Sequence, residues 1–182
     1  MKYFISGLLV VGALILSSPA EAQRADRKDF QIAMDMLSIV NNYDRYDVFD
    51  DISVNVKDGV VTMTGKVTFG LKAQEIAKLA KQIKGVVEVK NEVQQLPASK
   101  FDDNLRSAIA NAIYSNPSFS EYQMLKNKPI HIIVENGTVT LTGIVHGDVD
   151  RRLAYSLAMS SSATHVVNKL KTDSEAQAEL NR

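Results

Sequence analysis

The stretches DGVVTMTGKV at residues 58–67 and NGTVTLTGIV at residues 136–145 are nearly identical, and they decide how the chain is organised. Each begins with Asp-Gly or Asn-Gly, dipeptides that accept positive φ at both centres of a tight hairpin turn. Each then alternates apolar residues with threonine and closes on Thr-Gly, where a residue without a Cβ ends or bends a strand. Each stretch is therefore predicted to be the second arm of a β-hairpin inside an internal repeat.

The repeat extends in both directions from these hairpins. A helical spacing of apolar residues precedes each hairpin, and an alanine-rich helical segment and a last apolar strand follow it. The expected helices cover about 32–40, 71–84, 105–113 and 149–159, and the expected strands cover 52–56, 61–65, 86–93, 130–134, 139–143 and 163–170. Because a helix joins the second strand to the third, that pair is expected to be parallel, while the hairpin is antiparallel.

The fold class predicted from this order is α+β, with two tandem αββαβ domains. Each domain is expected to have a three-stranded mixed sheet that two helices cover on one face, since one face of each hairpin is apolar and the other is rich in threonine. The predicted boundaries are a signal peptide at 1–22, domains at 23–96 and 101–172, a linker at 97–100 and a flexible tail at 173–182.

The N-terminal residues have the pattern of a secretory signal peptide. Lys2 is followed by an apolar run over 4–16 that is too short to span a bilayer, and Ala20 and Ala22 supply the small residues of a cleavage site before Gln23. An uncleaved N-terminal membrane anchor is the alternative. The chain contains no cysteine, so neither a disulfide nor a lipid-modified cysteine is available. We expect a periplasmic protein, with any membrane attachment peripheral.

Composition and motifs exclude several functional classes. The chain has 21 basic and 21 acidic residues, so it lacks the positive charge of a nucleic-acid module, and no nucleic acid is expected as a partner. No nucleophile elbow, phosphate loop or zinc-protease motif occurs. A hydrolase is therefore the least favoured functional hypothesis. We predict no enzyme activity and no cofactor.

Two groups of residues were considered as metal sites. The three histidines, at 131, 146 and 165, match no spacing typical of a ligand pair, and we expect no metal. Residues 43–51 carry four aspartates among three aromatics, but they lack the ligand order and the glycine of an EF-hand. A solvated loop that Tyr46 and Phe49 hold against the core is the preferred interpretation.

The hairpins ending in Val61-Thr-Met63-Thr-Gly65 and Val139-Thr-Leu141-Thr-Gly143, and the phrase Gly85-Val86-x-x-Val89-x-Asn91-x-Val93, resemble the BON domain family. The whole chain is similar to a signal peptide plus two such domains, as in periplasmic OsmY-type osmotically inducible proteins. Ser162-Ala163 departs from the usual Gly-Val in the second copy. The resemblance implies binding to phospholipid surfaces or other envelope components, and a role in envelope integrity under osmotic stress. It implies no catalytic residues.

The residues expected to contact anionic phospholipid come from two regions. The helix at 71–84 is basic and amphipathic, as in helices that lie on anionic headgroups. Aromatic residues at the end of the second copy's first helix and in the following loop are the nearest membrane anchors in a chain without tryptophan. The candidates are Lys72, Lys78, Lys81, Lys84, Tyr114, Phe119 and Tyr122. An ordinary solvated face for the lysines, and core closure for the aromatics, are the alternatives.

A second surface favours a protein partner. Ile133 lies on the sheet face that should be polar, beside His131 and Thr140, whereas the first copy has Ser53 and Asn55 there. Because the linker at 96–100 is short and contains proline, this face is expected to pack against the first domain or a partner. A protein–protein adaptor or chaperone-like module is therefore the alternative function. Two similar domains on one short linker would each offer a binding surface. Once one surface is bound, the other is held near the same membrane or partner at a high effective concentration, so that two weak contacts combine.

Overall fold

A computed structural model describes residues 19–180, with side chains for residues 28–179. The first half contains α1 (Pro19–Asn42), β1 (Asp51–Lys57), β2 (Val60–Val67), α2 (Gly70–Ala80), β3 (Glu88–Asn91) and β4 (Gln94–Gln95). The second half contains α3 (Lys100–Tyr114), η1 (Pro117–Phe119), α4 (Ser120–Met124), β5 (Ile130–Glu135), β6 (Thr138–Val145), α5 (Asp148–Met159), β7 (His165–Asn168), β8 (Lys171–Thr172) and α6 (Asp173–Leu180). The predicted signal peptide's apolar run, 4–16, lies outside the described residues.

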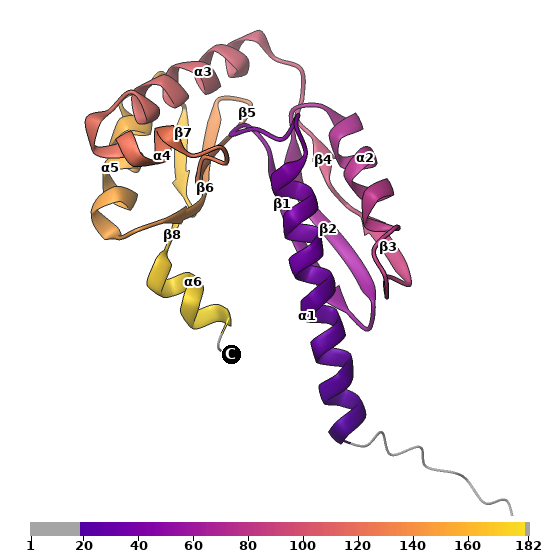
Figure 1. Ribbon diagram of the computed structural model, residues 1–182. Helices are drawn as coiled ribbons and strands as arrows, with labels where there is room; N and C mark the ends of the chain where they lie inside the picture. Colours follow the sequence, from indigo (N-terminus) through magenta and orange to yellow (C-terminus); the bar gives the residue numbers. More distant parts are fainter. Residues whose placement is uncertain (1–18, 181–182) are drawn as a thin grey trace, which may run out of the picture.

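The predicted α+β fold with two tandem domains is confirmed (Figure 1). Strand order is β1-β2-β3 in one sheet and β5-β6-β7 in the other, with antiparallel hairpins and parallel third strands. Each sheet has four strands rather than three, because the last strand is split in two. The side chains of Asn91 and Asn168 accept hydrogen bonds from the N–H of Val93 and Leu170, which turns the chain between the two segments.

The hairpin turns have the predicted conformation. Asp58 and Asn136 have φ of 53° and 51°, and the glycines that follow them also have positive φ. In each half a carboxylate from the preceding helix holds the turn. Asp29 accepts hydrogen bonds from both turn N–H groups at 2.7 and 2.8 Å, and Asp102 does the same at 2.9 and 2.8 Å. Sequence analysis did not identify these two carboxylates.

The glycine that ends each hairpin phrase allows the two strands to approach closely. Gly65 and Gly143 have φ of 121° and 108°, in a region that other residues rarely adopt. A Cβ atom would lie 2.1 Å from the carbonyl oxygen of Asp51 at the first position, and 1.9 Å from that of Pro129 at the second. The Thr-Gly ending of the quoted phrase is therefore a steric requirement of this fold.

Each domain has its own hydrophobic core between its sheet and its helices. The first contains Ile32, Met36, Val40, Ile52, Val61, Met63, Val67, Ala73, Ile76, Ala77 and Ala80. The second is larger, and in addition to the equivalent strand and helix residues it takes in the aromatics of the longer loop. The expectation of two separate, similar cores is met, with one exception: Val48 and Phe49 of the first half pack against the core of the second.

Residues 43–50, between α1 and β1, connect the two domains. Tyr46 packs against the first core, as expected, but Phe49 does not, because it lies against the second core with Val48. The carbonyl of Val48 accepts a hydrogen bond of 2.6 Å from the N–H of Ile132 at the outer edge of β5. The Tyr46 ring lies 5.5 Å from the ring of His131. We call residues 43–50 the docking loop.

Two predicted boundaries need correction. The basic helix ends at Ala80 rather than near Lys84, because the chain turns over 81–85 towards Gly85, whose φ of 98° is left-handed. The tail expected to be flexible forms helix α6 over Asp173–Leu180. Glu175 accepts hydrogen bonds from the N–H of Thr172 and from Arg151, which ties the start of this helix to the second domain.

Candidate binding surfaces

The lysines proposed for lipid contact divide into one buried residue and three exposed ones. Lys78 lies in the last turn of α2, and Lys81 and Lys84 lie in the turns that follow it. All three side chains are exposed. The ion pairs of the described side chains involve Lys66, Lys72, Arg106, Arg151 and Lys171 as the cations. Within residues 28–179, the three exposed lysines therefore have no carboxylate partner within 4 Å.

Lys72 is not available to a lipid surface, contrary to the prediction. Its side chain is buried, and its ammonium lies 2.6 Å from a carboxylate oxygen of Asp50 and 3.1 Å from one of Asp47. Asp50 is also fully buried, and it accepts hydrogen bonds from the N–H and the hydroxyl of Thr68. This ion pair joins α2 to the docking loop, so Lys72 stabilises the fold.

The three aromatic candidates belong to the core of the second domain, which was the alternative interpretation. Tyr114, Phe119 and Tyr122 are all buried. The Tyr114 hydroxyl donates to the carbonyl of Ile130 at 2.6 Å and accepts from the N–H of the same residue. The Tyr122 hydroxyl donates to Asp150 at 2.7 Å and accepts from the N–H of His146. None of these rings is placed to enter a membrane.

Burial raises the pKa of all these tyrosine hydroxyls. The pKa of Tyr122 rises to about 12, first because of burial and then because its hydrogen bond to Asp150 favours the neutral form. Burial likewise raises the pKa of Tyr46 and Tyr114, although their backbone hydrogen bonds act in the opposite direction. These phenols stay protonated at neutral pH, and their hydroxyls stabilise the fold through hydrogen bonds to the backbone and to Asp150.

Two groups of apolar side chains that were not among the predicted site residues are exposed. Met124 and Leu125, at the end of α4, are 88% and 49% exposed. On α1, Phe30, Met34 and Leu37 are 61%, 48% and 47% exposed. The sequence does contain a pattern for the second group, since these positions follow helical spacing on the side opposite Ile32 and Met36. The first group is two adjacent apolar residues within a polar loop.

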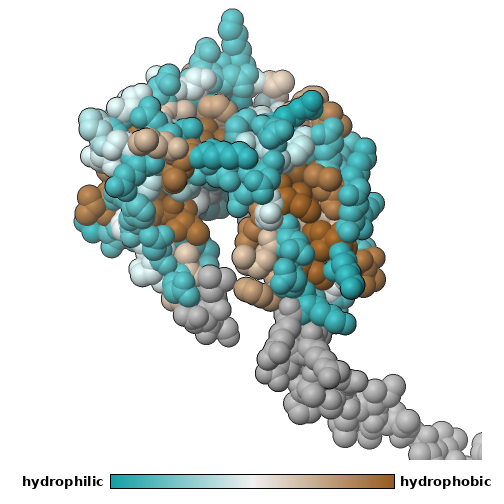
Figure 2. Space-filling model, in the orientation of Figure 1, coloured by the Kyte–Doolittle hydropathy of each residue, from teal (hydrophilic) through white to brown (hydrophobic). Residues whose placement is uncertain are grey.

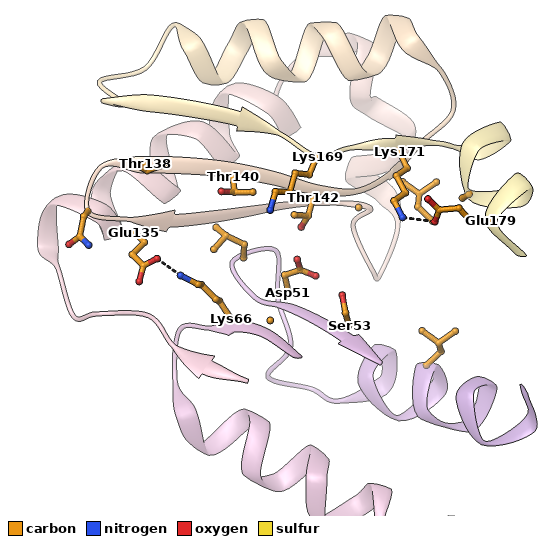
Figure 3. Close-up of a pocket in the computed structure, with 17 residues that line it drawn as sticks. Asp51, Ser53, Lys66, Glu135, Thr138, Thr140, Thr142, Lys169, Lys171 and Glu179 are labelled. Atoms are coloured by element: carbon orange, nitrogen blue, oxygen red, sulfur yellow. Dashed lines mark hydrogen bonds and ion pairs between the residues drawn. The ribbon is translucent and has the colours of Figure 1, made fainter. Parts of the chain in front are cut away.

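A cleft of about 1090 Å³ separates the two halves of the molecule (Figure 2). Its walls are the polar faces of the two sheets, together with α1 and α6. In the close-up, Ser53, Asp51 and Lys66 of the first sheet lie across from Thr140 and Thr142 of the second (Figure 3). Lys66 forms an ion pair with Glu135 across the cleft. The cleft is therefore bounded by an interdomain contact.

The three residues of the predicted interaction face all lie on the side of the second sheet that faces the first domain. Ile133 and Thr140 line the cleft, and Ile133 is buried. The ring of His131 packs at a tilted angle against that of Tyr46 in the docking loop. The outward isoleucine thus lies at the junction of the two domains, and this face is only partly accessible to a separate protein.

The described part of the chain has neither a membrane-spanning helix nor a cluster of metal-binding side chains. No helix within residues 19–180 combines the length and the apolar character needed to cross a bilayer. No cluster of three or more histidine, cysteine, aspartate or glutamate side chains in that range could hold a metal ion. Asp47 and Asp50, two of the four aspartates considered for calcium, are instead paired with Lys72.

Two matches to one family cover nearly all of both domains. The BON domain family matches residues 28–97 and 101–174, which are the two repeats seen in the fold. The chain belongs to the BON domain family. This family is implicated in phospholipid binding and in envelope-associated proteins, and BON domain proteins are generally non-enzymatic. The expected resemblance to two tandem BON domains is confirmed.

Solved structures of other proteins match this chain at low sequence identity. No curated protein matches the chain. One similar solved structure is CdsD, a structural protein of the type III secretion system of Chlamydia trachomatis, with 17% identity, a TM-score of 0.31, and coverage of 84% of this chain and 68% of that one. A structure of the CdsD C-terminal domain has 15% identity to this chain and a TM-score of 0.31. The match covers 79% of this chain and 66% of that one. Likeness at this level carries no argument about function.

Proposed function

We propose that this BON protein is a non-enzymatic periplasmic binding protein that contacts anionic phospholipid surfaces and so contributes to envelope integrity or stress tolerance. The observation that carries the proposal is the exposed set Lys78, Lys81 and Lys84 at the end of α2, none of which forms an ion pair with a side chain that the structure describes. Membership of a family implicated in phospholipid binding supports the same ligand.

The physical argument rests on charge and on two nearby apolar residues. Each lysine near an anionic membrane contributes on the order of 1 kcal/mol of attraction, so three lysines give weak, salt-sensitive, peripheral binding. Leu79, between two of the lysines, is 39% exposed, and Val87, after the third, is 79% exposed. The core-facing stripe of α2 is buried, so the helix contacts headgroups without inserting.

Vesicle co-sedimentation of the mature chain, which is residues 23–182 without the predicted signal peptide, tests this proposal. We expect binding to vesicles containing phosphatidylglycerol at low salt, and little binding to phosphatidylcholine vesicles or at high salt. The triple variant Lys78→Glu, Lys81→Glu, Lys84→Glu should lower the partition coefficient by at least tenfold, because each reversal replaces attraction with repulsion.

A matched control reverses three exposed charges on the second domain: Lys100→Glu, Arg152→Glu and Lys169→Glu. It changes net charge by the same amount and should leave most of the binding intact. Equal losses in the two triple variants would show that total charge alone governs association. Absence of binding to anionic vesicles by the unmodified chain would refute the lipid proposal.

An adaptor or chaperone-like role is the second candidate. The specific observation in its favour is the cleft of about 1090 Å³ at the domain junction, because clefts of this kind are frequent ligand sites. Cross-linking in intact cells, followed by mass spectrometry, separates the candidates. A discrete protein joined to residues of the cleft would favour the adaptor, whereas lipid contact alone predicts none.

A further inference from the structure

The outer edge of β5 in the second domain is occupied by the chain itself. The docking loop presents the carbonyl of Val48 to the N–H of Ile132 at 2.6 Å. Next along the edge, the Arg106 guanidinium donates to the carbonyl of Val134 at 2.5 Å. Ile132 and Val134 are both completely buried. Edge strands need such protection, because their free N–H and C=O groups otherwise pair with another chain.

The equivalent edge in the first domain, along β1, has one cap at Ile52, whose N–H donates to the Tyr46 hydroxyl at 3.3 Å. The two hairpins align with Val54 at the position of Ile132 and Val56 at the position of Val134. Among the residues that the structure describes, no backbone group bonds to the outer side of Val54 or Val56. Both valines are only partly buried, and Asn55 between them is exposed. The same strand position is thus capped in one domain and uncapped in the other.

Helix α1 has a small residue at the position where α3 has an arginine. The carboxylates Asp29 and Asp102 hold equivalent turns, so the helices align with Ala33 at the position of Arg106. Ala33 has no group that could cap the carbonyl of Val56. One turn further along α1, Leu37 is 47% exposed and lines the interdomain cleft together with Asp51 and Ser53. We call the surface formed by Ala33 and Leu37 of α1 and by Val54 and Val56 of β1 the open groove.

The second domain carries an apolar segment that no described part of the chain covers. Met124 and Leu125 lie between α3 and β5, in the loop that corresponds to the docking loop between α1 and β1. Met124 is 88% exposed, the highest value among the large apolar side chains that are exposed. Leu125, the residue that ends α4, has extended backbone torsions, with φ of −71° and ψ of 139°.

We propose that Met124 and Leu125 of one copy of this protein dock into the open groove of a second copy. The contact would repeat between molecules what the docking loop does within one molecule: a short apolar segment enters the space between helix and edge strand, and its carbonyl accepts a hydrogen bond from the strand. Because each copy has one segment and one groove on different domains, the contact is head-to-tail and can continue to a third copy.

Charge is compatible with association of identical chains. The chain has equal numbers of basic and acidic residues, so two copies have no net repulsion. Lys126 follows the apolar segment directly and is exposed, and Asp51 lies at the start of β1 beside the groove. Neither residue forms an ion pair among the described side chains. In the proposed contact these opposite charges lie on the two facing surfaces.

Sedimentation velocity on the mature chain tests the proposal with two complementary variants. The variant Met124→Ser, Leu125→Ser removes the segment and keeps the groove, while Leu37→Glu blocks the groove and keeps the segment. The unmodified chain should give an average mass that rises with concentration beyond that of a dimer. Each variant alone should stay monomeric, and an equal mixture of the two should form a one-to-one complex that grows no further.

Controls keep the result specific. Val149→Ser and Met159→Ser remove exposed apolar side chains from α5 and should leave the association unchanged. Circular dichroism should show that all variants remain folded, since every substituted residue is exposed. Hydrogen exchange provides a second measurement: the Val54 amide should become protected as the unmodified chain is concentrated, and should stay unprotected in the Met124→Ser, Leu125→Ser variant.

Several results would overturn the proposal. They are a monomeric unmodified chain at every concentration, a symmetric dimer that grows no further, association of either variant alone, or failure of the two variants to combine. The lipid proposal does not depend on this contact, because the lysines of α2 are not part of it. Vesicle binding by the monomeric variants would therefore stand whatever the outcome here.

Discussion

At the scale of single residues, the two turn-holding carboxylates differ in burial although their hydrogen bonds are alike. Asp102 is completely buried, whereas Asp29 is half-buried. Each accepts two N–H groups of its hairpin turn at 2.7 to 2.9 Å. Bonds to a charged acceptor are strong, and N–H groups left without a partner are most costly where water cannot reach them.

We therefore predict unequal costs for the same substitution. Asp102→Ala should lower the free energy of unfolding by about 3 kcal/mol, and Asp29→Ala by about 1 kcal/mol, because water can replace the lost carboxylate only at the first turn. Urea denaturation of each variant beside the unmodified chain measures this difference. Equal losses would show that burial of the second carboxylate has no energetic consequence.

At the scale of elements, the basic helix α2 illustrates how one lysine differs from its neighbours. Lys72, in the first turn, is buried against Asp50 and bonds to the Thr68 hydroxyl at 2.9 Å. It thereby joins the start of α2 to the docking loop. Lys78, in the last turn of the same helix, is exposed to solvent. The sequence alone does not distinguish them, since both are lysines on one amphipathic helix.

Replacing these lysines by methionine should separate their roles. Lys72→Met leaves a buried carboxylate without its cation and should reduce the free energy of unfolding by about 3 kcal/mol. Lys78→Met should change stability by less than about 0.5 kcal/mol. Thermal or chemical denaturation compares the two variants directly. Wild-type stability in Lys72→Met would contradict a stabilising role for this buried ion pair.

At the scale of the whole molecule, the docking loop makes the two repeats unequal. It starts in the first domain, and two of its side chains complete the core of the second. The ion pair of Lys66 with Glu135 adds a second link between the sheets. The two similar domains are therefore joined by contacts as well as by the short connection before α3. Ile132 and Val134 of β5 are capped, whereas no described backbone group caps their equivalents Val54 and Val56 of β1.

This asymmetry predicts a local change in hydrogen exchange. Phe49→Ala removes a ring that packs against the second core, so the docking loop should detach more often and expose the Ile132 amide, which Val48 otherwise protects. The exchange rate of that amide should rise by at least tenfold. The Thr62 amide inside the first sheet serves as the reference, and a parallel rise there would instead indicate global destabilisation.

The hairpin phrases, together with the apolar spacing before and after them, were sufficient to predict the repeat, the order of elements and the two cores. The reason is local: Asp-Gly and Asn-Gly select the turn, period-two residues select the buried face, and Gly65 and Gly143 permit a close approach that any Cβ would prevent. Exposure of Lys78 and Lys81 also followed from helical periodicity. These features depend on neighbours within a few residues, which a sequence displays directly.

Which of several chemically similar residues are buried, and what they contact, became clear from the folded chain. Lys72, Tyr114, Phe119 and Tyr122 were candidates for a membrane surface, and each is buried by segments distant in the sequence. The same applies to Phe49, which belongs to the first half of the chain but packs against the core of the second domain. Burial and pairing arise from long-range contacts, whereas turn type and strand alternation arise from the chain's own torsional and hydrophobic preferences. That difference separates what this sequence determined by itself from what required the folded molecule.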